Sequence, residues 1–210
     1  LLSDSSGRLW VGTDAGLDVF NPQLQAFDRF SLGDGGQTVA SISVFALAEG
    51  MDGDVWVGTD RGLVQVRPNG SERWFQHDLI KSNTLAPGSV RALYFDEFNR
   101  LWVGTDVGGV TVIDAQGQIQ RRLVSDPLDE NSLSENAVRA IQADNLGRIW
   151  FGTFTRGVSV FDERDDRWFR FQNRDSDSAS LSGDSVRSIL QSQNGDLWVG
   201  TDGGLNLWQG

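Results

Sequence analysis

The sequence predicts an all-β protein built from a repeated unit, and three observations carry this prediction. The motif Trp-(Val/Phe)-Gly-Thr occurs five times, and its copies begin at Trp10, Trp56, Trp102, Trp150 and Trp198, spaced by 46 or 48 residues. The chain contains 25 Gly but only 4 Pro in its 210 residues, and the glycines recur at fixed places around the motif. No segment shows the apolar spacing of an amphipathic helix.

Each unit divides into four short strands in the order of the chain. The first is Val-Arg-Ala-Leu-Tyr-Phe, at 90–95 in the third unit, and the second is Leu-Trp-Val-Gly-Thr itself. The third alternates apolar residues after a Gly, and the fourth is rich in aromatic residues, as in 168–171. β-Branched and aromatic side chains favour pleated strands. The turns at 13–16 and 144–147 place Gly or Asn where a tight turn needs positive φ.

Four strands in a period of about 45 residues are typical of a propeller blade, a small sheet that must stack on its neighbours to bury both faces. We expect the recurrent Trp side chains to fill the space between sheets. We expect the Gly two residues later to let the next sheet approach closely; these glycines are Gly12, Gly58, Gly104, Gly152 and Gly200.

The register of the repeats predicts a β-propeller fragment with three complete blades and two incomplete terminal ones. The predicted blade segments are 1–36, 37–82, 83–129, 130–178 and 179–210. Leu1 and Leu2 align with the end of a first strand, and 205–208 form a third strand. Further blades of a longer parent chain are therefore expected partners, and the exposed blade edges predict self-association or dependence on those blades.

Composition excludes several classes of function. The 18 Lys and Arg against 29 Asp and Glu give a net charge of −11, which argues against nucleic acid as a partner. The chain has no Cys and only one His, His77, so we expect no metal, no cofactor and no thiol nucleophile. No apolar run approaches the ~20 residues of a membrane-spanning helix, so no membrane contact by this segment is expected.

The motif Leu-Trp-Val-Gly-Thr-Asp-x-Gly-Leu, preceded by Ser-Leu-Ser-x-x-x-Val-Arg-x-Ile at 132–141 and 180–189, resembles the two-component regulator propeller repeat. The resemblance covers nearly the whole chain. It implies the periplasmic sensor region of a hybrid histidine kinase or a diguanylate cyclase, with the enzymatic output elsewhere in the parent protein. Members of the family often sense saccharides or other small molecules, but they share no fixed ligand motif.

The candidate binding face is the end of each blade that carries the second-to-third-strand turns and the long connections at 31–43, 76–88, 123–136 and 172–184. Variable loops on a rigid scaffold commonly bind ligands. Arg91, Arg139 and Arg187 each follow the Val that opens a first strand, which would place them near the channel mouth. One interpretation is purely structural: each Arg pairs with an Asp of the nearby turn.

Blades two and four depart from this pattern. Blade two has Phe45 in place of the Arg, and its turn carries Arg61. Blade four keeps Arg139, but its turn reads Phe154-Thr155-Arg156 and lacks the Asp. Two cations beside an aromatic ring suit a carboxylate, a phosphate or an acidic sugar. The hypothesis is a site for an anionic or polyhydroxylated ligand near blade four, with Phe154 capping the neighbouring blade as the alternative.

Three other classes remain open at this point: a propeller lyase or similar enzyme, a stand-alone propeller lectin, and a protein-interaction scaffold. The pair His77-Asp78 follows a fourth strand and lacks a recognisable nucleophile elbow, which argues against catalysis. A lectin would repeat its binding residues in every blade, whereas here the turns differ. An interaction scaffold would expose an apolar patch.

Overall fold

The computed structural model describes residues 1–34, 37–38 and 42–209, and their sheets confirm the all-β propeller fold. Five antiparallel sheets follow one another along the chain. Blade one comprises β1 (Leu2–Ser3), β2 (Leu9–Thr13), β3 (Gly16–Asn21) and β4 (Ala26–Phe30). Blade two comprises β7 (Val44–Glu49), β8 (Val55–Thr59), β9 (Gly62–Val66) and β10 (Glu72–Phe75).

The other three blades repeat this plan. Blade three comprises β11 (Val90–Phe95), β12 (Leu101–Thr105), β13 (Val110–Ile113) and β14 (Ile119–Leu123). Blade four comprises β15 (Val138–Ala143), β16 (Ile149–Thr153), β17 (Val158–Asp162) and β18 (Arg167–Phe171). Blade five comprises β19 (Val186–Gln191), β20 (Leu197–Thr201) and β21 (Gly204–Trp208), which form a three-stranded sheet. Blade one is completed only by the two-residue β1, the stub that the sequence predicts.

One short hairpin was not predicted. It pairs β5 (Gly33–Asp34) with β6 (Gln37–Thr38) and lies in the first long connection, 31–43. Part of that connection and the predicted blade boundary at 36 fall outside the described residues. None of the described residues belongs to a helix of the length and apolar character needed to cross a membrane.

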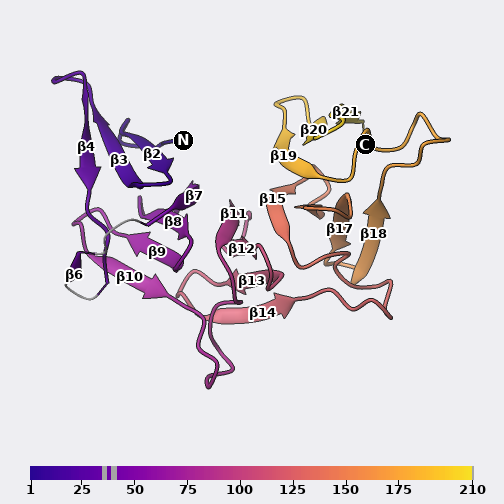
Figure 1. The fold of residues 1–210 in the computed structure, drawn as a ribbon, viewed down its shortest axis with the longest axis horizontal. Helices are drawn as coiled ribbons and strands as arrows, with labels where there is room; N and C mark the ends of the chain where they lie inside the picture. Colours follow the sequence, from indigo (N-terminus) through magenta and orange to yellow (C-terminus); the bar gives the residue numbers. More distant parts are fainter. Residues whose placement is uncertain (35–36, 39–41, 210) are drawn as a thin grey trace.

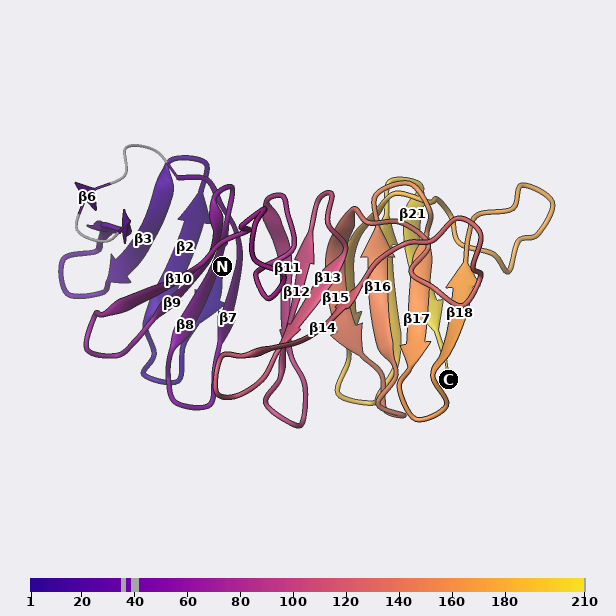
Figure 2. The same ribbon diagram turned by 90° about the horizontal axis from the view of Figure 1, so that it is seen from below.

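The blades form an arc in which the first strand of each sheet faces the inner side and the fourth faces outward (Figure 1). We call these the inner and outer strands. The inner strands β7, β11, β15 and β19 pack against one another in sequence. Seen from the side, the sheets stand next to each other with their turns at two opposite ends (Figure 2). One end carries the turns between the second and third strands together with the long connections.

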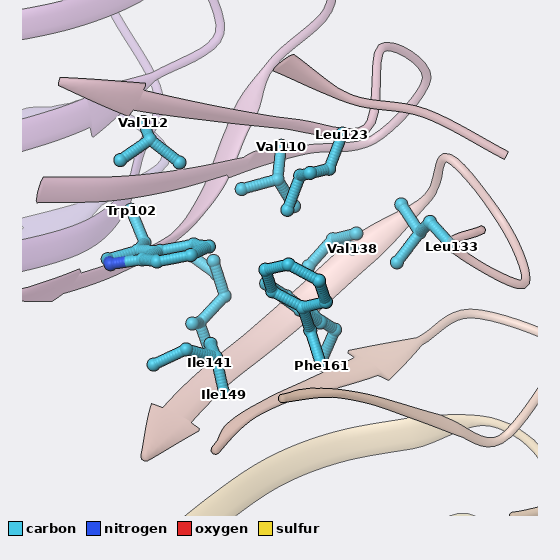
Figure 3. Packing of buried hydrophobic residues seen from close by; sticks show 11 residues of the cluster. Trp102, Val110, Val112, Leu123, Leu133, Val138, Ile141, Ile149 and Phe161 are labelled. Carbon is cyan, nitrogen blue, oxygen red and sulfur yellow. The ribbon is translucent and has the colours of Figure 1, made fainter. Parts of the chain in front are cut away.

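Apolar side chains fill the space between neighbouring sheets, and Trp side chains dominate it. Trp10, Trp56, Trp102 and Trp150 are buried, whereas Trp198 in blade five is only partly buried. Figure 3 shows the layer between blades three and four, where Trp102 and Val110 face Ile141 and Phe161. Buried Val, Leu and Ile side chains complete the layers, and each large buried aromatic residue adds a large apolar area to them.

The glycine of the first four Trp-x-Gly-Thr motifs is required by this packing, whereas a Cβ on Gly200 in the fifth would meet only Ser188 of its own blade. A Cβ atom on Gly152 would lie 2.5 Å from Cγ1 of Val186 in the next blade. The same near-contact recurs between Gly12 and Val44, between Gly58 and Val90, and between Gly104 and Val138. The predicted close approach is therefore confirmed at all four junctions between blades, and it explains the Val that opens each inner strand.

Candidate functional site

The candidate site lies on the inner side of the arc, where four inner strands begin. The second residue of β7, β11, β15 and β19 is Phe45, Arg91, Arg139 and Arg187, respectively. In every one of these strands the pairing register shifts across this residue, which is the mark of a β-bulge. A bulge takes one residue out of the ladder and re-aims its side chain. The repeated bulge therefore positions Arg91, Arg139 and Arg187, which we call the arginine row.

Two guanidinium groups of the row lie over phenylalanine rings. The Cζ atom of Arg91 is 3.7 Å from the ring centroid of Phe45 in the preceding blade. The Cζ atom of Arg139 is 3.8 Å from the centroid of Phe154 in the turn of its own blade. Both rings are about 40% exposed, at 39% for Phe45 and 41% for Phe154. Such stacking holds the plane of a guanidinium and leaves its N–H edges free for hydrogen bonds.

The three charges of the row act on one another. The pKa of Arg139 is lowered, first by burial and then by repulsion from Arg187 and Arg91. Glu135 and Asp106 oppose this effect but do not cancel it. Of the three arginines, only Arg91 has a carboxylate within ion-pair distance among the described residues, although the chain as a whole is strongly acidic. An excess of like charge held in place is an attractive site for an anion.

The ion pairs between these arginines and the turn aspartates form only in blade three. There Arg91 Nη2 lies 3.4 Å from Asp106 Oδ2. Among the described residues, neither Arg139 nor Arg187 has a carboxylate within ion-pair distance. Asp60 and Asp106 also accept backbone hydrogen bonds from the Ser just before the inner strand, from Ser43 N at 3.2 Å and from Ser89 N at 2.8 Å. Their main role is thus to fix the chain as it enters the blade.

Blade four replaces the missing turn aspartate with Glu135, a residue that the sequence reasoning missed. The Glu135 carboxylate accepts hydrogen bonds from Thr155 N at 2.7 Å and from Thr155 Oγ1 at 3.1 Å. It thereby fixes the turn that presents Phe154 to Arg139. The signal was present in the sequence, because the aligned positions in blades three and five are Pro87 and Gly183.

The structure gathers only part of the predicted set. Arg91, Arg139, Arg187 and Phe154 lie together, and Phe45 joins them. Arg61 and Arg156 are exposed, and no hydrogen bond or ion pair in the described part of the chain links their side chains to the row. The cationic neighbours of Arg139 are instead Arg187 and Arg91. The role of each residue in binding stays a prediction.

The one histidine, His77, lies in the connection between β10 and β11. His77 Nδ1 lies 2.9 Å from the carbonyl oxygen of Leu85, which places the ring in a loop-fixing role. Within residues 1–34, 37–38 and 42–209, no group of three or more His, Asp or Glu side chains is arranged to hold a metal ion. Two grooves lie outside the arginine row. One, of about 610 Å³, lies between blades four and five, and the other, of about 480 Å³, lies beside the turns that join the first and second strands of blades three and four.

The fold and the repeated bulge define the protein as a β-propeller segment with a non-repeating inner surface. Four segments, 38–61, 84–107, 132–155 and 180–203, match the family described as the two-component regulator propeller. Each segment runs from a long connection through the inner strand to the turn after the second strand. The chain therefore carries four repeats of the two-component regulator propeller family. No curated protein matches it.

Solved structures share the fold at low sequence identity. One is described as the extracellular domain of the one-component system BT4673 from B. thetaiotaomicron, with 22% identity, a TM-score of 0.76, and coverage of 95% of this chain and 25% of that one. PorZ is described as a surface component of the type-IX secretion system of Porphyromonas gingivalis. It has 20% identity and a TM-score of 0.74, and the match covers 98% of this chain and 31% of PorZ.

The likeness also extends to an enzyme. A catalytically inactive virginiamycin B lyase from Staphylococcus aureus has 13% identity, a TM-score of 0.67, and coverage of 99% of this chain and 68% of that one. At these identities the likeness establishes the fold alone. The chain spans only a quarter of the length of the BT4673 domain.

Proposed function

We propose that the chain is a non-catalytic, ligand-sensing propeller segment of a bacterial two-component or cyclic-di-GMP signalling receptor. In this proposal it lies on the outer side of the inner membrane, in the periplasm. The repeat family supports the signalling role, and the likeness to the extracellular BT4673 domain supports the location. The ligand is a small anionic or polyhydroxylated molecule, with an acidic saccharide as the leading candidate.

The observation that carries the proposal is the arginine row itself. Three guanidinium groups follow the first residue of three successive inner strands, and burial, followed by repulsion from Arg187 and Arg91, lowers the pKa of Arg139. Repulsion of this kind is relieved when a carboxylate or phosphate binds between the cations. Arg139 and Arg187 are the expected ligand contacts, because Arg91 already forms an ion pair with Asp106. A ligand held by both would bridge blades four and five.

A thermal-shift experiment with matched probes tests this function. Galacturonate and inorganic phosphate should raise the Tm of the protein, whereas neutral galactose should not. The Arg139→Ala and Arg187→Ala variants should lose most of this shift, and added salt should weaken it. Arg61→Ala and Arg156→Ala remove the same charge at exposed positions outside the row and serve as controls.

Two results would contradict the proposal. The first is that neither anion raises the Tm of the unmodified chain. The second is an equal shift in the control variants and in the Arg139→Ala/Arg187→Ala double variant, which would place anion binding elsewhere on the surface.

A further inference from the structure

A separate feature of the molecule is the groove of about 480 Å³ between blades three and four. We call it the junction groove. It lies at the end of the blades opposite the arginine row, and Figure 2 shows these two ends as two sets of turns. One wall is the turn after β11, at 96–100, and the other is the turn after β15, at 144–147. Tyr94 and Ala143, near the ends of these two inner strands, also line it. Its volume suits a small molecule.

At two other junctions, a long polar side chain at the end of an inner strand is bonded to the turn of the preceding blade. Between blades one and two, the Glu49 carboxylate accepts hydrogen bonds from Ser5 N at 2.8 Å and from Ser5 Oγ at 2.6 Å. Between blades four and five, Gln191 Nε2 donates to Asn145 Oδ1. Each of these contacts ties one blade to the next.

Between blades two and three, an aromatic ring takes the same place. Phe95 is the last residue of β11, and its ring centroid lies 6.2 Å from that of Trp56 in the preceding blade. A Cβ atom on Gly50, in the turn of that blade, would lie 3.4 Å from Phe95 Cζ. This junction is therefore filled by apolar packing.

The junction between blades three and four has neither of these contacts. The residue at the end of its inner strand is Ala143, and the turn position of Ser5 and Asn145 is taken by Glu97. In the part of the chain that the structure describes, the Glu97 carboxylate makes no hydrogen bond or ion pair. A Cβ atom on Gly147 would lie 3.8 Å from Glu97 Oε1, so this carboxylate reaches the turn of blade four. The small side chain of Ala143 leaves the space open, and an unpaired carboxylate lies beside it.

Both walls of the junction groove are fixed by hydrogen bonds of their own. In blade three, Asp96 Oδ1 accepts a hydrogen bond from Phe98 N at 3.0 Å, and in blade four Asp144 Oδ1 accepts one from Leu146 N at 2.9 Å. Phe98 and Leu146, one on each wall, are 67% and 55% exposed. The groove therefore offers an apolar side chain on each wall, and because the turns are already ordered, binding costs less conformational entropy.

The two cations that line the groove are already paired with carboxylates. Arg100 donates to Asp96 Oδ2 at 2.7 Å and to the two oxygens of Glu163 at 3.0 and 2.6 Å. Arg164 pairs with Asp162 at 3.2 Å. Neither guanidinium is therefore available to attract an anion into the groove.

The phenol of Tyr94 lies in the field of the acidic residues. Its pKa is raised, first by burial and then by the negative charges of Asp96 and Glu97, and a hydrogen bond with the backbone of Ala143 opposes this effect. Tyr94 therefore stays neutral at physiological pH. The groove combines a neutral aromatic side chain with an unpaired negative charge, which together attract a cation.

We propose that the junction groove binds a small organic cation, a primary ammonium group carried on an apolar body. The ammonium group takes the place of the polar side chain that joins the blades at other junctions, and it donates a charge-assisted hydrogen bond to Glu97. The apolar body packs between Phe98 and Leu146. This site differs from the arginine row in position and in charge, so it does not depend on the function proposed above.

The composition of the groove favours an organic cation over a metal ion. Hard cations such as Ca²⁺ require about six or more oxygen ligands, many of them carboxylates. Among the described residues, no group of three or more acidic or histidine side chains is arranged to hold a metal ion. Glu97 is a single free carboxylate between apolar walls, which suits one ammonium group on an apolar stem.

Three probes that share one ring and differ in charge test the proposal: phenethylammonium, phenethyl alcohol and phenylacetate. Each is titrated into the isotope-labelled 210-residue chain, and the backbone amide shifts are followed by NMR. Phenethylammonium should produce saturable shifts in residues 96–100 and 144–148. The alcohol should bind about tenfold more weakly or worse, because it lacks the charged donor, and phenylacetate should shift neither segment.

Two protein variants locate the site. Glu97→Gln should weaken binding of phenethylammonium about tenfold and leave binding of the alcohol unchanged. Glu130→Gln, at an exposed position in the long connection 123–136 at the other end of the blades, is the matched control and should change neither. Ala143→Gln should restore a bond between the blades, by analogy with Gln191 and Asn145. It should abolish binding and raise the Tm by about 2–4 °C.

Each of the following results would overturn the proposal: no saturable shift with phenethylammonium, equal affinity for the ammonium and the alcohol, or unchanged binding in Glu97→Gln. Shifts spread over the whole surface would also overturn it, since they would indicate general attraction of a cation to an acidic chain. Because the probes leave the protein itself unaltered and Glu97 is exposed, a folding defect in Ala143→Gln cannot decide the outcome.

Discussion

At the scale of single residues, the fold depends on a buried carboxylate that recurs in the first turn of three blades. In blade four, Asp144 Oδ2 accepts hydrogen bonds from Arg148 Nε at 2.6 Å and from the Trp150 indole N–H at 2.9 Å. Asp4 and Asp96 hold Arg8 with Trp10 and Arg100 with Trp102 in the same way. The carboxylate therefore orients the Trp that fills the space between blades. Blades two and five have Gly50 and Ser192 at this position.

Asp4 makes the stability of blade one depend on pH. Burial by itself raises the pKa of Asp4, but hydrogen bonds from Ser6, Trp10 and Arg8 outweigh it and lower the pKa well below its ordinary value near 3.8. A depressed pKa contributes stability that is complete above the unfolded-state pKa and is lost as the pH falls below it. We expect Asp4→Asn to lower the free energy of unfolding by roughly 2 kcal/mol at pH 7.

Urea unfolding of both proteins at several pH values measures this effect. The difference between them should shrink as the pH falls below about 4, since the carboxylate of the unfolded state then binds a proton while the native carboxylate, with its lowered pKa, stays charged. A difference that stays constant down to pH 2 would show that the charge of Asp4 does not matter.

The glycine at each junction between blades gives a second prediction at this scale. Gly152→Ala should lower the free energy of unfolding by about 1–3 kcal/mol, because the new methyl group would overlap Val186 Cγ1. Gly200→Ala is the matched control, since there a Cβ meets the Ser188 hydroxyl and no residue of another blade. Urea denaturation compares the two. Adding Val186→Ala to Gly152→Ala should recover part of the loss, and equal losses at both glycines would refute the packing explanation.

At the scale of elements, the outer strands do more than complete their sheets. They also hold the long connections that surround the candidate binding face. Arg170 contacts the loop of its own blade through carbonyl oxygens about 40 residues earlier in the chain. The same loop is also tied to β17, where Ser134 N donates to Ser159 Oγ, and to β18, where Trp168 N donates to Asn131 Oδ1, so the guanidinium is one of several ties between the loop and the sheet.

Removing this tie should loosen the loop without unfolding the blade. In Arg170→Ala, backbone amides of residues 126–134 should exchange hydrogen about tenfold faster or more, while those of β15 and β16 should not change. Hydrogen-exchange mass spectrometry measures both regions. Arg167→Ala, an exposed arginine on the same strand, is the control. Unchanged exchange of the loop in Arg170→Ala would mean that other contacts hold it.

At the scale of the whole molecule, the arc has a gradient of burial along it. All residues of β12 and β16 are buried, whereas most residues of β2 and β20 are only partly buried. Each blade packs only on its neighbours in sequence, so stability accumulates from nearest-neighbour contacts, as in other repeat proteins.

Native-state hydrogen exchange should follow this gradient. We expect the slowest exchange in β12 and β16 and faster exchange in β2 and β20, because the terminal blades each have one neighbour fewer. Uniform protection across all five blades would contradict nearest-neighbour stability and indicate a single cooperative unit.

The repeat in the sequence was sufficient to predict the fold and much of the candidate site. The Trp-x-Gly-Thr motif identified the second strand of every blade, and the strand predicted at 90–95 matches β11, Val90–Phe95. Val-Arg at the start of the inner strands placed Arg91, Arg139 and Arg187 at one end of the arc. These features are local and periodic, so aligning the chain with itself reveals them.

The tertiary structure alone decided how these residues meet. The bulge that aims Arg139, the stacking of Arg91 on Phe45 of the preceding blade and the substitution of Glu135 for a turn aspartate all join residues of different strands or blades. Spacing in a repeat specifies which strand a residue occupies. The twist and stacking of the sheets determine which side chain of a neighbouring blade that residue contacts, because equivalent positions in successive blades are 46 to 48 residues apart in the chain.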